Sequence, residues 1–147
     1  MKRRTRIGFC LILATLLLVL ETTAQSGYKV IKPDKITAGR TAGEKVYEFV
    51  LPANEWVVTS LLITPSQEIL IHHFTSSERV TVKLGSLTDS RLQAPGRILP
   101  LYTSRNCKGD RGVTAKVTYT CVQLSKPEGV KLFAKNSVRV GIVVRNR

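Results

Sequence analysis

The stretch VTAKVTYTCVQL, residues 113–124, decides the predicted fold class. Apolar and polar side chains alternate along it. Its odd-numbered positions are Val113, Ala115, Val117, Tyr119 and Cys121, and its even-numbered positions include Thr114, Lys116, Thr118 and Thr120. A period of two indicates a β-strand with one buried face and one solvated face. The stretch therefore predicts one long strand whose odd-numbered side chains face a core.

Short runs of β-branched and aromatic residues also occupy the rest of the chain after residue 27. Turn residues such as Pro52-Ala53-Asn54 separate them, and no segment keeps a helical period over three turns. The predicted strands are 28–32, 46–51, 55–63, 68–74, 79–87, 97–103, 113–124, 130–134 and 138–144. This pattern predicts an all-β fold, either a single antiparallel β-sandwich or a small barrel, with eight or nine short strands.

The first 24 residues have a different composition. MKRRTR is basic, the 14 residues IGFCLILATLLLVL (7–20) are apolar or small, and Glu21 ends the run. A bilayer span needs about 20 apolar residues, so the pattern is typical of a secretory signal peptide rather than an anchor. We expect cleavage after Ala24. Residues 25–147 would then form a single domain of a secreted, extracellular protein without a transmembrane segment.

Cleavage there would leave two cysteines, Cys107 and Cys121, because Cys10 lies in the signal peptide. Outside the cell the expected state is a disulfide, and the alternative is a pair of free or intermolecular thiols. A loop of this length gives about 3 kcal/mol of stabilisation in the chain-entropy model. The bond would also constrain the segment RNCKGDRG (105–112).

Within that segment, Lys108-Gly109-Asp110 resembles an integrin-binding tripeptide. Gly and Asp are equally common in ordinary turns, so the alternatives of a recognition site and a solvated turn both stay open.

The positive charge is unevenly distributed. The whole chain has a formal net charge of +13, and residues 1–24 hold four of its 23 basic and one of its ten acidic side chains, which leaves +10. Residues 25–90 carry seven charges of each sign, so the whole excess belongs to residues 91–147. Such a field attracts anionic partners, for example a sulfated glycan, an acidic protein or an anionic surface. The alternative is that the charge only aids solubility.

Lys and Arg side chains on the wet faces of neighbouring strands would contact sulfates or carboxylates. The candidate anion-binding residues are Arg91, Arg97, Arg105, Lys108, Arg111, Lys116, Lys131, Lys135, Arg139 and Arg145. Whether they form one stripe depends on which strands are neighbours, which the sequence does not show.

Other chemistries find little support. His72 and His73 are adjacent on a predicted strand and would point to opposite faces, so we predict no metal site and no cofactor. Motifs such as G-x-S-x-G and H-E-x-x-H are absent, and we predict no enzymatic activity. Trp56 lies in an apolar run, which favours a core position over the alternative, a sugar-stacking platform. Aromatic residues do not interleave with basic ones in the sequence, so no nucleic-acid partner is expected.

The sequence thus predicts a secreted, non-enzymatic binding or matrix-associated protein whose basic C-terminal half contacts an anionic partner. The alternative is a cationic host-defence or toxin-like protein that acts on membranes or microbes. A binding module would be retained on a polyanion in a salt-sensitive manner without lysis, whereas a defence protein would make anionic vesicles leak.

Overall fold

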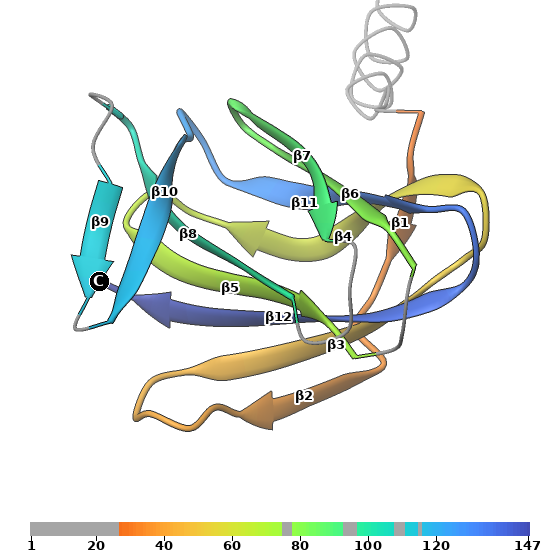
Figure 1. Cartoon of the computed structure of the whole chain (residues 1–147), viewed down its shortest axis with the longest axis horizontal. Coiled ribbons are helices and arrows are strands. Elements are labelled where there is room, and N and C mark those ends of the chain that lie inside the picture. Colours follow the sequence, from red (N-terminus) through yellow and green to blue (C-terminus); the bar gives the residue numbers. More distant parts are fainter. Residues whose placement is uncertain (1–26, 75–77, 93–96, 108–110, 115) are drawn as a thin grey trace, which may run out of the picture.

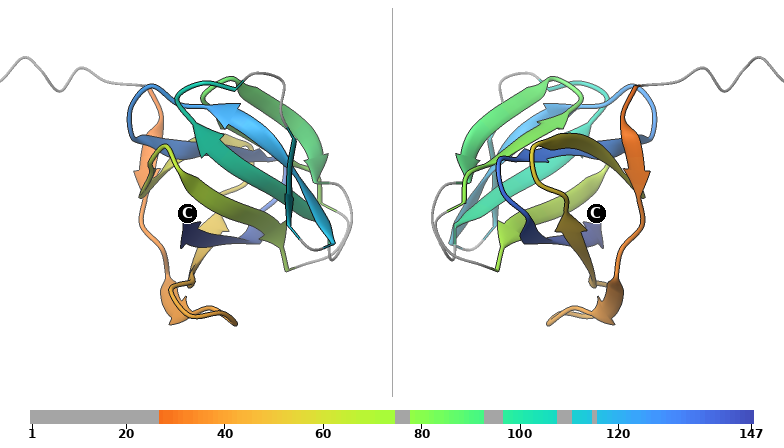
Figure 2. Two further views of the ribbon diagram at one scale, coloured as in Figure 1. Left: turned by 90° about the vertical axis from the view of Figure 1, so that its left-hand side faces the viewer. Right: turned by 90° about the vertical axis from the view of Figure 1, so that its right-hand side faces the viewer.

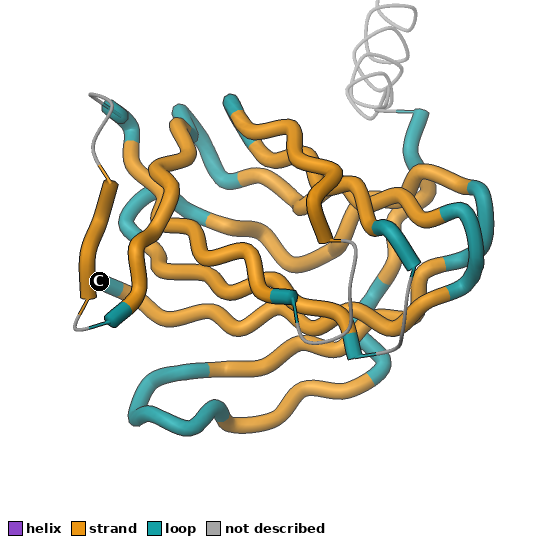
Figure 3. Tube along the Cα trace, viewed as in Figure 1, coloured by secondary structure: helices purple, strands orange, loops and turns teal. Residues whose placement is uncertain are grey.

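The computed structural model describes residues 27–74, 78–92, 97–107, 111–114 and 116–147, and these consist of strands and loops (Figure 3). Within these ranges there is no helix able to cross a membrane. The predicted signal peptide, residues 1–24, lies outside the described residues.

The described strands form two sheets (Figure 1). The five-stranded sheet has the order β1 (Lys29–Ile31), β4 (Glu55–Ile63), β11 (Glu128–Ala134), β6 (Val80–Leu84) and β7 (Leu87–Leu92). The seven-stranded sheet has the order β2 (Lys35–Ala38), β3 (Lys45–Leu51), β12 (Val138–Asn146), β5 (Gln67–His73), β8 (Ile98–Ser104), β10 (Val117–Gln123) and β9 (Arg111–Thr114). The all-β prediction is confirmed.

Three details of that prediction are wrong. The described residues form twelve strands rather than eight or nine. The sheets are not purely antiparallel, because β1 pairs with β4 and β8 pairs with β10 in parallel. Neither sheet closes into a barrel, since each has two edge strands. Parallel neighbours need a long crossover connection, and here the hairpin of β2 and β3, which belongs to the other sheet, lies between β1 and β4 in the chain. This crossover between sheets leaves no short-range signal in the sequence.

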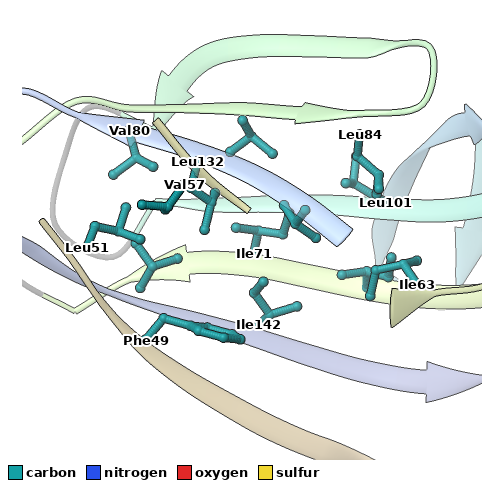
Figure 4. Packing of buried hydrophobic residues seen from close by; sticks show 14 of the residues in the cluster. Phe49, Leu51, Val57, Ile63, Ile71, Val80, Leu84, Leu101, Leu132 and Ile142 are labelled. Carbon is teal, nitrogen blue, oxygen red and sulfur yellow. The ribbon is translucent and has the colours of Figure 1, made fainter. Parts of the chain in front are cut away.

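The core lies between the two sheets (Figure 4). Val57 and Leu132 enter it from the five-stranded sheet, and Phe49, Ile71 and Ile142 enter it from the seven-stranded sheet. All five are fully buried. Burial of each such side chain stabilises the fold by about 1.5–3 kcal/mol relative to exposure. The inward positions follow the period of two along each strand.

The segment 113–124 does not form the single strand that was predicted. Instead, β9 and β10 pair as an antiparallel hairpin in which Thr114 lies opposite Val117. Val113 is 71% exposed and Val117 is 40% exposed, whereas Val122 and Leu124 belong to the core. Contrary to the prediction, the odd-numbered face therefore does not line the core, although Tyr119 on that face is buried.

The direction of the side chains in β10 explains why the odd-numbered face does not line the core. Cys121 is bonded to Cys107, which follows the neighbouring strand β8. Val122 is fully buried in the core, so the neighbouring Cys121 points to the opposite side of β10. The apolar positions of β9 belong to an edge strand that contributes nothing to the described core.

The predicted strand 79–87 also splits, into β6 and β7, at a tight turn. Gly85 has a φ of +50° there, which disfavours any other residue. A Cβ atom at Gly85 would lie 2.2 Å from the carbonyl oxygen of Gln123. Glycine is therefore required at this turn.

Strand β4 contains a bulge opposite β11. Leu62 pairs with Gly129 and Val58 pairs with Lys131, so β4 has two more residues than β11 across this interval. The bulge interrupts the backbone hydrogen bonds between β4 and β11, and the hydroxyl of Thr59 supplies substitutes. It accepts a hydrogen bond from the backbone N–H of Val130 at 3.1 Å and donates one to the carbonyl of Leu61 at 3.1 Å. The bulge is thus fixed by one buried side chain.

Candidate ligand-binding face

Three aromatic rings and two lysines lie together on the outer face of the five-stranded sheet. They are Tyr28, Trp56, Lys83, Lys131 and Phe133, which we call the aromatic–lysine face. The ring centroids of Trp56 and Phe133 are 5.4 Å apart, and those of Tyr28 and Trp56 are 6.0 Å apart. Lys83 Nζ lies 4.5 Å from the centroid of the Trp56 ring, and Lys131 Nζ lies 5.2 Å from that of Tyr28. All five side chains are partly exposed.

The pleat of the sheet places these residues. Lys131 and Phe133 flank the buried Leu132, so both point outward from β11. Strand register then puts Phe133 opposite Trp56, and Lys131 opposite Lys83. Residues that are up to about a hundred positions apart in the chain become neighbours through the strand order β1-β4-β11-β6.

Among the residues that the structure describes, the two lysines of this face have no acidic partner. Like charges directly opposite each other on a sheet destabilise it by about 0.2–1 kcal/mol. The aromatic rings compensate, because a cation over an exposed ring gains about 0.5–1 kcal/mol. Ion pairs in the described part of the chain involve Arg139, Arg145 and Arg147, and neither Lys83 nor Lys131. Both ammonium groups can therefore contact an external anion.

Sequence reasoning missed this face. Trp56 was predicted to lie in the core, and the structure corrects that prediction, because Trp56 is outside the buried cluster and partly exposed. In EWVVTSLLI (55–63) both faces of β4 carry apolar residues, which hides the period of two. Aromatic and basic residues do not interleave in the sequence, yet the fold interleaves them in space.

Of the predicted anion-binding residues, Lys131 belongs to the aromatic–lysine face. Arg139 and Arg145 lie on β12, in the other sheet. Arg139 forms an ion pair with Glu48 at 3.9 Å, and Arg145 hydrogen-bonds to Glu68, which raises the pKa of Arg145. The structure thus brings Arg139 and Arg145 to carboxylates of the N-terminal half rather than to Lys131.

Four further candidates are exposed: Arg97, Arg105, Lys116 and Lys135. Arg91 and Arg111 lie in β7 and β9, but their side chains are outside the described part of the structure. Lys108, with the whole tripeptide Lys108-Gly109-Asp110, also lies outside the described residues. The described candidates are therefore distributed over both sheets and several loops.

The predicted disulfide is present. Cys107 and Cys121 are bonded, with their Cα atoms 5.8 Å apart. The bond joins the segment that follows β8 to the middle of β10.

His72 and His73 point to opposite faces of β5. His73 is buried in the interior, whereas His72 lies on the outer face, edge-on to Phe74 with ring centroids 4.6 Å apart. Partial burial lowers the pKa of His72, and the neighbouring His73 lowers it further. Among the described residues, no group of three His, Cys, Asp or Glu is arranged to hold a metal ion.

A groove of about 570 Å³ lies near His72, between the turn joining β2 to β3 and the outer face of the seven-stranded sheet. The β2–β3 hairpin extends beyond the body of the two sheets (Figure 2). The aliphatic walls come mainly from Val46, Leu70, Ile98 and Val143. Arg40, Thr41 and Glu44 from the β2–β3 hairpin add polar groups to the lining, so the groove is apolar on the sheet side and polar at the hairpin.

No family model matches the chain, and no curated protein matches it. Two solved structures are similar, both of PliG, a periplasmic lysozyme inhibitor of g-type lysozyme. The protein from Salmonella Typhimurium is 9% identical and that from Aeromonas hydrophila 8%; each has a TM-score of 0.40 and covers 81% of this chain and 98% of its own. Similarity of this size assigns no function to the chain.

Proposed function

We propose that this protein is a secreted, non-enzymatic binding protein for an acidic polysaccharide, and that the aromatic–lysine face is its main contact. The observation that carries the proposal is the position of Lys83 and Lys131, which lie over aromatic rings and form no ion pair within the described ranges. A surface of this kind complements a ligand that combines flat apolar patches with negative groups.

A sulfated or uronate-containing polysaccharide has both properties. The C–H groups on one side of a pyranose ring form an apolar patch that can stack on Trp56 or Phe133. Sulfate and carboxylate groups at the ring edge can then accept hydrogen bonds from Lys83 and Lys131, and such charge-assisted bonds contribute about 1.5–3 kcal/mol each. An acidic protein would supply the negative charge but not a regular series of apolar ring faces.

The remaining positive charge adds long-range attraction. Arg97, Arg105, Lys116 and Lys135 are exposed, and a field of this sign raises the association rate of a polyanion in a salt-dependent manner. Arg139 and Arg145 contribute less to this field, because Glu48 and Glu68 offset their charges. In this proposal the predicted anion-binding residues divide into one direct contact, Lys131, and a set that steers the ligand.

Retention on immobilised heparin tests the proposal. The protein, expressed from the full chain, should be eluted only by NaCl above physiological concentration, and the double variant Lys83→Gln/Lys131→Gln should elute much earlier. Lys116→Gln/Lys135→Gln is the matched control, since it also removes two positive charges and both lysines are exposed and outside the aromatic–lysine face. Its elution should shift only slightly, because two steering charges of several are lost.

Three outcomes would overturn the proposal. Equal early elution of the control and the double variant would show that net charge alone causes retention. Equally tight binding to polyglutamate or to single-stranded nucleic acid would show that the polyanion need not be a polysaccharide. Leakage of anionic vesicles at the concentrations that saturate heparin would instead favour the membrane-active alternative.

A further inference from the structure

We propose a second anion site, specific for a sulfate or phosphate monoester, in a groove at the end of the molecule where the β4–β5 turn, the end of β8 and the β10–β11 turn meet. This end lies to the left in Figure 1, whereas β1, next to the aromatic–lysine face, lies to the right. The groove has a volume of about 570 Å³. Its polar lining consists of Thr64, Ser66, Ser104, Arg105, Ser125 and Lys126, which we call the serine groove.

The composition of the lining indicates an anionic ligand. Arg105 and Lys126 supply two positive charges, and neither forms an ion pair in the described structure. None of the lining residues that the structure describes is a carboxylate. A guanidinium group can hold two oxygens of one anion, and a second cation across the groove neutralises the remaining charge.

Hydroxyl groups complete the site. Those of Thr64, Ser66 and Ser125 take part in none of the hydrogen bonds found between described residues, so they can donate to a ligand. Three hydroxyl donors in addition to two cations match a tetrahedral oxyanion with three terminal oxygens better than a carboxylate with two. This comparison favours a sulfate or phosphate monoester.

The backbone around the groove is fixed before any ligand binds. Ser66 N–H donates to the carbonyl of Thr103 at 2.9 Å, and Leu124 N–H donates to the carbonyl of Ser104 at 2.8 Å. The hydroxyl of Ser104 accepts a hydrogen bond from Asn106 N–H at 3.2 Å, next to Arg105. The disulfide after Asn106 attaches this segment to β10. A site held in this way loses little conformational entropy on binding.

One lining residue has an unfavourable backbone conformation. Ser66 has a φ of +78°, in the left-handed region that favours glycine. A serine at such a position retains a hydroxyl group in the groove at the expense of local stability, and strained residues of this kind often occur at binding sites. The turn after Pro65 requires a positive φ at this position, so the lining carries the proposal and Ser66 supplies one of its hydroxyl groups.

Backbone amide shifts in ¹⁵N-labelled protein, at constant ionic strength, test the site. Glucosamine 6-sulfate and glucose 6-phosphate are the two probes, and the tighter of them identifies the natural source of the anion. We expect saturable shifts at Ser66, Arg105 and Lys126 and at least a tenfold weaker Kd in the double variant Arg105→Gln/Lys126→Gln. Lys116→Gln should bind as the unmodified protein does.

The variant Ser66→Gly separates a binding role from a structural one. It should raise the Tm by a few degrees, because glycine relieves the positive φ, and yet weaken the binding of the tighter probe. Unchanged binding in Ser66→Gly together with unchanged binding in the double variant would overturn the proposal, as would shifts spread evenly over exposed lysines. Trp56 is remote from the groove, so this result is independent of the heparin experiment.

Discussion

Replacing Thr59 by valine tests how the five-stranded sheet is held together. Thr59 is 2% exposed, and its hydroxyl is the acceptor for the backbone N–H of Val130 at the β4 bulge. Valine has nearly the same shape, so Thr59→Val leaves no cavity but removes both hydrogen bonds made by the hydroxyl. The N–H of Val130 is then buried without its described acceptor, since Val130 itself is fully buried.

The expected loss of stability follows from the unsatisfied N–H group of Val130. A buried donor left unsatisfied costs about 1–3 kcal/mol, and the carbonyl of Leu61, which is only partly buried, can be hydrated at little cost. The extra methyl contact of valine returns less than about 1 kcal/mol. We therefore expect Thr59→Val to lower the free energy of unfolding by about 1–2 kcal/mol.

Urea denaturation at 25 °C measures this difference, with an unchanged slope as the check that only the native state is affected. Thr120→Val is the matched control, because Thr120 is exposed on β10, and its effect should be within about 0.5 kcal/mol. A change in Thr59→Val no larger than that of the control would refute the role assigned to the hydroxyl at the bulge.

Two further predictions concern glycines and pH. In urea denaturation, Gly129→Ala should lower the free energy of unfolding by more than about 1 kcal/mol, because the new Cβ would lie 2.4 Å from a backbone oxygen. Gly141→Ala should lower it less, since its new Cβ would meet mainly the ring of Phe74, which is exposed and can move. Gly129→Ala no costlier than Gly141→Ala would contradict this. Burial lowers the pKa of His72 below its ordinary 6.5, so the unfolded chain takes up a proton first as pH falls and stability declines below about pH 6.5. His72→Gln should show a smaller decline between pH 7.5 and 5 in urea midpoints; an equal decline would exclude His72 as the cause.

The sequence predicted the fold class well and the topology poorly. Strands such as Val138–Asn146 are recognisable because one face is buried and the other solvated. The segment 113–124 was wrongly predicted to be one strand, because the exposed edge strand β9 continues the alternation of apolar and polar residues seen in β10. The parallel pair of β8 and β10 depends on contacts that no local pattern encodes.

The candidate site, like the topology, could be predicted from the sequence only in part. The charge excess of residues 91–147 was evident from the sequence, and the disulfide followed from the cysteine count. The pairing of Arg145 with Glu68, and of Lys83 with Trp56, depends on strand order, which joins the two halves of the chain. Sequence composition therefore predicted that an anion would be bound but not which basic residues have no acidic partner.

The fluorescence of Trp56 tests the central proposal most directly, because it is the only tryptophan of the chain and lies in the aromatic–lysine face. Titration with a heparin oligosaccharide should change its emission saturably, and Lys83→Gln/Lys131→Gln should weaken that titration at least tenfold, which corresponds to about 1.4 kcal/mol. Full binding of the oligosaccharide, measured by calorimetry, without any change in Trp56 emission would contradict the account.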